Sequence, residues 1–189
     1  MLKNILAMIG ALVSVIVIIG AVMFGSQVSK LDSGALPAYM DMFGTVLETG
    51  NAAEAMILEY KVDEDVTNED VAESIYALTE EANMRITGDI KMFTEENAKG
   101  TEVKHARIFS LCSLQIAKVF MNYSPHYGGF MPCRIMLIEF GNGDRILYTM
   151  DLTLMIHGGQ PLSPKMLELA TIVQASMTGI PARAAKGDF

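Results

Sequence analysis

We predict an α+β protein, in which a single N-terminal transmembrane helix precedes a mainly antiparallel sheet with helices packed on one face. Three observations predict this architecture. A run of uncharged residues lies near the N-terminus. After it, segments with the two-residue periodicity of strands and segments with helical periodicity follow in the order β-α-β-β-α-β-β-α. The chain has 189 residues, which is enough for one domain with its own core plus an appendage.

The predicted transmembrane helix is Ile5–Phe24, a stretch of twenty residues without a charge. At 1.5 Å per residue it is roughly 30 Å long, which matches the hydrocarbon core of a bilayer. A cleaved secretory signal peptide is the competing interpretation. The apolar run is longer than usual for such a peptide, and the following GSQVSKLDSG lacks a small-x-small cleavage site. We therefore expect residues 1–30 to be an uncleaved anchor in contact with the lipid bilayer.

The distribution of charge predicts the orientation of this anchor. Lys3 precedes the span, and Lys30 is the first cation after it. By the positive-inside rule, the short N-terminus is cytoplasmic and the remaining chain lies on the periplasmic, extracytoplasmic side of the cytoplasmic membrane. All 22 acidic residues but only 13 of the 14 Lys and Arg follow the span, which gives that part a net charge near −9. This balance argues against nucleic acid as a partner.

Five segments after the anchor are predicted to be strands. The strand at Arg85–Phe93 is interrupted by Gly88, and Asn142-Gly143 predicts a tight turn between the last two strands. In chain order the strands are Ala55–Val62, Arg85–Phe93, His105–Cys112, Cys133–Phe140 and Arg145–Leu152.

The helices are predicted from periodicity and from capping residues. A helix beginning at Pro37 and ended by Gly50 forms a neck at residues 31–51. The domain proper then covers residues 52–189. Its first helix has Thr67 as N-cap with Asp70 in the capping-box position. Its last two helices are opened by Ser113 and by Ser163-Pro164, and we expect Gly179 to end the last one.

With these elements in order, the chain resembles the domain of unknown function family numbered 302. The resemblance runs from about residue 52 to the C-terminus and is carried by VTNEDVAESI, IFSLCSLQIAKVFM, FMPCRIMLIEF and LYTMDLTLMIHGGQPL. It implies a compact α+β fold that tends to form dimers and no established enzyme activity. The membrane-anchored, Met-rich form resembles a branch of the family associated with sulfur-oxidising bacteria, which implies a link to sulfur metabolism.

The strongest candidate site is the pair Cys112 and Cys133. Cys112 ends one predicted strand and Cys133 begins the next, so antiparallel pairing brings both thiols to the same end of the sheet. Three interpretations remain open for the pair. It forms a disulfide or two buried apolar thiols, it binds a metal, heme or sulfur species, or it performs catalytic thiol chemistry.

Three further residues are candidates beside this pair. Arg134 follows Cys133 and either pairs with a carboxylate or binds an anion. Alternation along the strand turns it away from Cys133 unless Pro132 bends the strand. His126 and Met131 precede the same strand and are the candidate metal ligands, with nitrogen and sulfur atoms that suit copper or heme iron. No cofactor at all is equally compatible with the sequence, because it contains no CxxC, CxxCH or HExxH motif.

The sequence shows no carboxylate pair, phosphate-binding loop or serine elbow that defines a hydrolase or kinase. Our leading hypothesis is a membrane-anchored extracytoplasmic accessory or binding protein without assigned catalysis. It forms a homodimer or associates with a membrane redox complex. The alternative is a protein that handles a metal, heme or sulfur species through Cys112 and Cys133.

Overall fold

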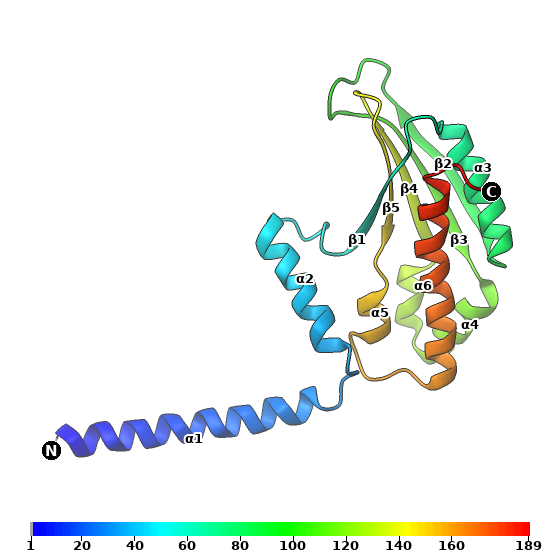
Figure 1. Ribbon diagram of the computed structural model, residues 1–189. Coiled ribbons are helices and arrows are strands. Elements are labelled where there is room, and N and C mark those ends of the chain that lie inside the picture. The colour runs from blue at the N-terminus through cyan, green and yellow to red at the C-terminus, as the bar shows by residue number, and fades with distance from the viewer. Residues whose placement is uncertain (1) are drawn as a thin grey trace. The chain divides into compact units, whose positions relative to one another are not determined.

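The computed structural model describes the backbone of residues 2–189 (Figure 1). Met1 and the side chains of Leu2, Asn4, Ile5 and Ala7, which belong to the predicted anchor, lie outside the described residues. The elements in chain order are α1 (Leu2–Val28), α2 (Ala35–Thr49), β1 (Ile57–Lys61), α3 (Asn68–Glu81), β2 (Arg85–Thr94), β3 (Val103–Cys112), α4 (Leu114–Tyr123), the 3₁₀ helix η1 (Pro125–Phe130), β4 (Cys133–Phe140), β5 (Arg145–Met150), α5 (Thr153–His157) and α6 (Pro164–Ala184).

The chain divides into two compact units. The first joins the residues up to Met40 with Thr153–Leu162, and the second joins Asp41–Leu152 with Ser163–Phe189. Within the first unit, His157 Nδ1 lies 2.9 Å from Asp32 Oδ1. Hydrogen bonds from the Gly34 amide and from His157 lower the pKa of the Asp32 carboxyl. These contacts explain why a segment far along the chain groups with the neck.

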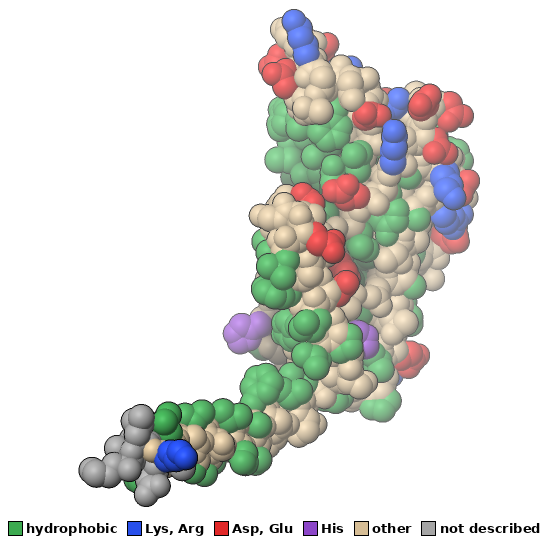
Figure 2. Space-filling view, turned by 60° about the vertical axis from the view of Figure 1, so that its left-hand side comes forward, with side chains coloured by type: hydrophobic (Ala, Val, Ile, Leu, Met, Phe, Trp, Pro, Cys, Tyr) green, Lys and Arg blue, Asp and Glu red, His purple; other side chains and the backbone are tan. Residues whose placement is uncertain are grey.

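The first unit contains α1, which is long and apolar enough to cross a membrane. The stretch Met8–Val28 meets that description over 21 residues, and none of it is buried in the structure. Hydrophobic side chains run along α1 in Figure 2, with one basic side chain near its N-terminus. A single N-terminal helix of this kind fits a single-pass anchor, as the sequence predicts.

The second unit is built on an antiparallel sheet of five strands. The strand order is β1-β5-β4-β3-β2, and every neighbouring pair is antiparallel. Helices α3, α4 and α6 lie on one side of this sheet (Figure 1). The predicted fold class is therefore confirmed: an α+β domain in the order β-α-β-β-α-β-β-α, with a mainly antiparallel sheet and helices on one face.

The core lies between the sheet and these helices. Alternate residues of the three central strands point into it and are fully buried, namely Phe109, Leu111, Ile135, Leu137 and Leu147. Ile75 of α3 and Met177 of α6 pack against these side chains and are 0% and 2% exposed. Burial of side chains of this size contributes roughly 1.5–3 kcal/mol each to stability.

Most of the predicted local signals are confirmed. Thr67 and Asp70 form a complete capping box at the start of α3. Gly50 directly follows α2 with a φ of 70°, and Gly143 has a φ of 91° in the β4–β5 turn. Both values lie in the left-handed region that glycine adopts without strain.

The prediction that Gly179 ends the last helix is wrong. Helix α6 continues through Gly179 and Pro181 to Ala184. The reason is tertiary, because Ile180, Pro181 and Ala184 are buried against the rest of the unit. Burial of one apolar face outweighs the roughly 1 kcal/mol by which glycine disfavours a helix.

The other differences concern element ends, one loop and one cap: β1 is shorter than predicted, at Ile57–Lys61, and α2 and β3 each begin two residues earlier than predicted. The last strand stops at Met150 rather than Leu152, and the short helix α5 follows it. Part of the predicted loop before β4 is the 3₁₀ helix η1. Ser113 occupies the N-cap of α4 as expected, but its side chain makes no capping hydrogen bond.

Candidate functional site

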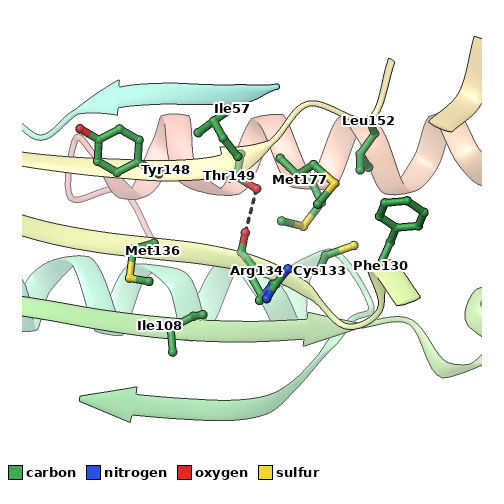
Figure 3. A pocket seen from close by; sticks show the side chains of 11 residues that line it. Ile57, Ile108, Phe130, Cys133, Arg134, Met136, Tyr148, Thr149, Leu152 and Met177 are labelled. Atoms are coloured by element: carbon green, nitrogen blue, oxygen red, sulfur yellow. Dashed lines mark hydrogen bonds between the residues drawn. The ribbon is translucent and has the colours of Figure 1, made fainter. Parts of the chain in front are cut away.

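The candidate site is a pocket of about 200 Å³ at one end of the sheet (Figure 3). Pairing between β4 and β5 ends at Ile135 and Thr149. Beyond this point the Thr149 hydroxyl donates a 2.9 Å hydrogen bond to the Arg134 carbonyl. The pocket opens beside this bond and is lined by Ile57, Ile108, Phe130, Cys133, Arg134, Met136, Tyr148, Thr149, Met150, Leu152 and Met177.

The lining of this pocket is mostly apolar and rich in sulfur. Three methionines reach it from separate elements, Met136 from β4, Met150 from β5 and Met177 from α6. Cys133 adds a fourth sulfur atom. The rings of Phe130 and Tyr148 lie at its two ends in Figure 3. Methionine is flexible and polarizable, so such a wall adapts to an apolar or aromatic guest.

Cys133 and Arg134 stand differently in this pocket although they are neighbours. The Cys133 side chain is half-buried, whereas Arg134 is exposed. Burial raises the pKa of Cys133 to about 11, and the nearby Cys112 adds to the rise, while Arg134 lowers it only slightly. The thiol is therefore protonated at neutral pH, a state that is a poor nucleophile and a poor metal ligand.

Cys112 ends β3 and lies next to Leu111, the residue that pairs with Cys133. The structure thus brings the two predicted cysteines to the same end of adjacent strands. They are not bonded to each other. Cys112 lines a different hollow, together with Arg85 and Met84. Burial raises its pKa as well.

The structure does not bring the candidate metal ligands into this pocket. His126 is exposed on η1, where its Nδ1 lies 3.2 Å from the Ser124 hydroxyl. Met131 follows η1 and precedes a cis bond to Pro132. Neither residue lines the pocket that contains Cys133. Among the described residues, no three His, Cys, Asp or Glu side chains are grouped as a metal site requires.

Sequence reasoning missed Thr149, Met150, Met177 and Phe130 as pocket residues. The methionines fall on apolar faces and are therefore indistinguishable from core residues in the sequence. Only the strand order, which places β5 between β1 and β4, brings these residues beside Cys133 and Arg134. The residues that sequence reasoning did identify there are Cys133 and Arg134.

Fold and site together define a small α+β domain with a five-stranded antiparallel sheet and a sulfur-lined pocket at one end of it. A family model described as "Domain of unknown function DUF302" matches residues 58–183. The chain therefore belongs to the DUF302 family. No curated protein matches it.

A solved structure has the same fold. It is the crystal structure of an uncharacterized conserved protein DUF302 from Bacillus stearothermophilus. The TM-score is 0.51 at 14% sequence identity, and the match covers 68% of this chain and 97% of the other. At this identity the likeness concerns the fold alone, and it confirms the architecture of the second unit.

Proposed function

The side of the sheet opposite the helices carries two rows of side chains that run across the strands. The first row is Ile90, Ile108, Met136 and Tyr148, and the second is Phe93, Ala106, Ile138 and Ile146. The members on the edge strand β2 are well exposed, with Ile90 at 57% and Phe93 at 49%, whereas Ala106 is buried at 4% and the other five are partly exposed. We call these eight residues the open face. In the second unit, no described helix covers it.

An apolar sheet face of this kind is unusual for an isolated domain. A sheet generally buries its hydrophobic face against another layer, and larger exposed apolar patches mark interaction sites. Hydrophobic side chains gather below the charged loops at the top of the domain in Figure 2. On β1 the same two rows end in Glu59 and Lys61, which give the patch a charged border.

We propose that this protein is a membrane-anchored accessory protein without catalysis of its own, and that its outer domain associates through the open face. Through this face the chain forms a homodimer or binds a membrane redox complex. The single observation that carries this proposal is the uncovered apolar open face. The anchor supports it, because tethering to a membrane raises the effective concentration of the domain for membrane partners.

The domain is proposed to lie on the periplasmic side of the cytoplasmic membrane. Lys3 before the span and the acidic residues after it support this orientation. In intact cells, an impermeant amine reagent is expected to label Lys165, which is exposed on α6. Labelling only after lysis, or a mature chain that begins after Gly25, would contradict the proposed topology.

The alternative, chemistry at Cys112 and Cys133, has less support. Both thiols have raised pKa values caused by burial, and they line different hollows. A thiolate that binds metal or attacks a sulfur species needs the opposite shift. Thiol titration with metal analysis and an absorbance spectrum tests this alternative, and it gains support only from bound metal, heme or a reactive thiolate.

Association is tested with the full chain extracted in a mild detergent and analysed by native mass spectrometry. We expect a dimer or a complex with co-purified proteins. Ile90→Asp and Phe93→Asp place a charge on the open face and are expected to shift the chain to the monomer. Neither residue lines the pocket.

The matched control is Ile172→Asp on the helical side, where the wild-type side chain is 46% exposed. This variant is expected to associate as the wild type does. A wild-type chain that stays monomeric and without partners at every protein concentration overturns the proposal.

A further inference from the structure

The interior of the pocket is suited to a compact apolar group. Its volume is about 200 Å³, and its deeper walls are formed by Met177 and Leu152, which are 2% and 8% exposed, while Phe130 is 45% exposed and lies at the rim. An apolar cavity of roughly 150 Å³ in another protein holds benzene, so this pocket has room for a ring with one substituent. Methionine sulfur atoms also make favourable contacts with aromatic rings.

Arg134 adds a positive charge to this otherwise neutral lining. Its guanidinium is exposed and forms no hydrogen bond or ion pair with the residues that the structure describes. By contrast, the guanidinium groups of Arg107 and Arg183 are engaged with the carboxylates of Asp89 and Glu81. Among the described residues of this chain, Glu139 and Asp144 pair instead with Lys104 and Lys61.

The backbone of Arg134 is nevertheless held in place. The Thr149 hydroxyl binds its carbonyl oxygen, and Thr149 itself is 3% exposed. Within the sheet, Arg134 of β4 also pairs with Ser110 of β3. A fixed backbone with a free guanidinium is a suitable arrangement for binding an anion, because arginine presents two parallel N–H groups to a carboxylate.

We propose that this pocket binds a small carboxylate with an apolar body, whose carboxylate pairs with Arg134 and whose body lies among the methionine and aromatic side chains. Ile108, Met136 and Tyr148 belong both to this pocket and to the open face, but the inference does not rest on association through that face. The chemistry of the lining selects the ligand: the walls exclude a strongly polar body, and the single cation at the edge requires one negative charge.

The four sulfur atoms suggest a soft metal such as Cu(I) as the competing occupant. Three of them belong to neutral thioethers, and the fourth belongs to the half-buried Cys133. A copper site would leave the charge of Arg134 unused and would place that cation beside a bound cation. The observed combination of one free cation with neutral walls favours the carboxylate.

The test uses the full chain in zwitterionic detergent micelles, labelled with ¹³C at the methionine methyl groups. The probe is 4-fluorobenzoate, and empty micelles serve as the reference for partitioning. We expect saturable shifts of the Met136, Met150 and Met177 methyl signals. The signal of Met84, which lines the other hollow, is expected to stay in place.

Two variants assign the charge contact. Arg134→Gln is expected to weaken the apparent affinity at least tenfold, and 4-fluorobenzyl alcohol, which lacks the charge, is expected to lose as much with the wild type. The matched control is Arg85→Gln, because Arg85 is also exposed but lies outside this pocket. It is expected to bind the probe as the wild type does.

Several results would overturn the proposal. One is the absence of saturable shifts, and another is equal binding of the alcohol and the carboxylate. A third is stoichiometric uptake of Cu(I) that displaces the probe and shifts the same methyl groups. Because Ile90→Asp and Phe93→Asp leave the pocket lining intact, loss of association and loss of ligand binding are separate outcomes.

Discussion

The Thr149 hydroxyl donates a 2.9 Å hydrogen bond to the carbonyl oxygen of Arg134, at the point where β4 and β5 stop pairing. This bond connects the two strands across the edge of the pocket. It holds the backbone of Arg134 while the guanidinium remains free. The bond therefore links the stability of the sheet end to the position of the cation that we assign to ligand binding.

Replacement of Thr149 by Val tests the contribution of this bond. The two side chains have nearly the same shape, but valine cannot donate a hydrogen bond to the carbonyl of Arg134. The site is buried, since Thr149 is 3% exposed. We expect unfolding by urea to show a loss of about 1–2 kcal/mol. The control is Thr171→Val, since that hydroxyl bonds within the exposed surface of α6. A loss no larger than that of the control would contradict the assigned role.

Replacement of Asp89 by Asn tests an ion pair between β2 and β3. Arg107 Nε and Nη2 lie 2.8 and 2.7 Å from the two Asp89 oxygens. The side chains of Arg107 and Asp89 are 13% and 19% exposed. We expect a loss of about 1–3 kcal/mol near pH 7, because Arg107 loses its charged partner. Glu168→Gln is the control, because its pair with Lys165 is largely exposed and is expected to contribute little.

The same variant has a predictable pH dependence. The hydrogen bonds from Arg107 lower the pKa of Asp89 below its usual 3.8. The folded state therefore releases this proton more readily than the unfolded state, and the stabilisation is present above 3.8 and lost as the pH falls through the lowered value. Urea unfolding should give a constant difference between wild type and Asp89→Asn from about pH 7 to 5 and a smaller one at about pH 3. An unchanged difference at the lowest pH would count against this linkage.

The reactivity of the two thiols is a further prediction. With iodoacetamide at about pH 8, we expect Cys133 to be modified much more slowly than an ordinary cysteine, because burial raises its pKa to about 11. Mass spectrometry of digested protein measures both sites, and guanidinium-unfolded protein gives the reference rates. Because the raised pKa lets the folded state keep the Cys133 proton to higher pH than the unfolded state does, the contribution of the protonated thiol to folding stability should be complete below about pH 9. It should decrease between about pH 9 and 11. Rapid modification of Cys133 in the folded chain would refute the prediction.

Two helix caps that look alike in the sequence should differ in energy. Thr67 Oγ1 accepts a 3.1 Å hydrogen bond from the Asp70 amide, and the Thr67 amide donates a 2.8 Å hydrogen bond to the Asp70 carboxylate. We expect Thr67→Ala to cost about 1 kcal/mol. Ser113 makes no such bond, so Ser113→Ala should change stability by less than about 0.5 kcal/mol. Thermal or urea unfolding of both variants measures the contrast, and equal losses would show that the difference in cap geometry is unimportant.

Much of the fold could be predicted because its signals are local. Alternation of apolar residues identified all five strands, and the Thr67–Asp70 pair located the start of α3. Local signals failed where burial decides, as at Gly179, which lies inside α6 because the following turn is buried. For the site they succeeded only in part. Cys133 and Arg134, predicted from the sequence, line the pocket, whereas the predicted metal ligands His126 and Met131 do not.

By itself, the sequence determined the apolar N-terminal helix, the type and order of the elements and the family. Each of these depends on the spacing of side chains along one segment, which the sequence contains completely. The tertiary structure alone decided which sulfur atoms share a pocket, that Arg134 has a free guanidinium, and that the apolar rows from Ile90 and Phe93 form one open face. These properties depend on strand order and register, which bring together residues distant in the chain and bury some of them.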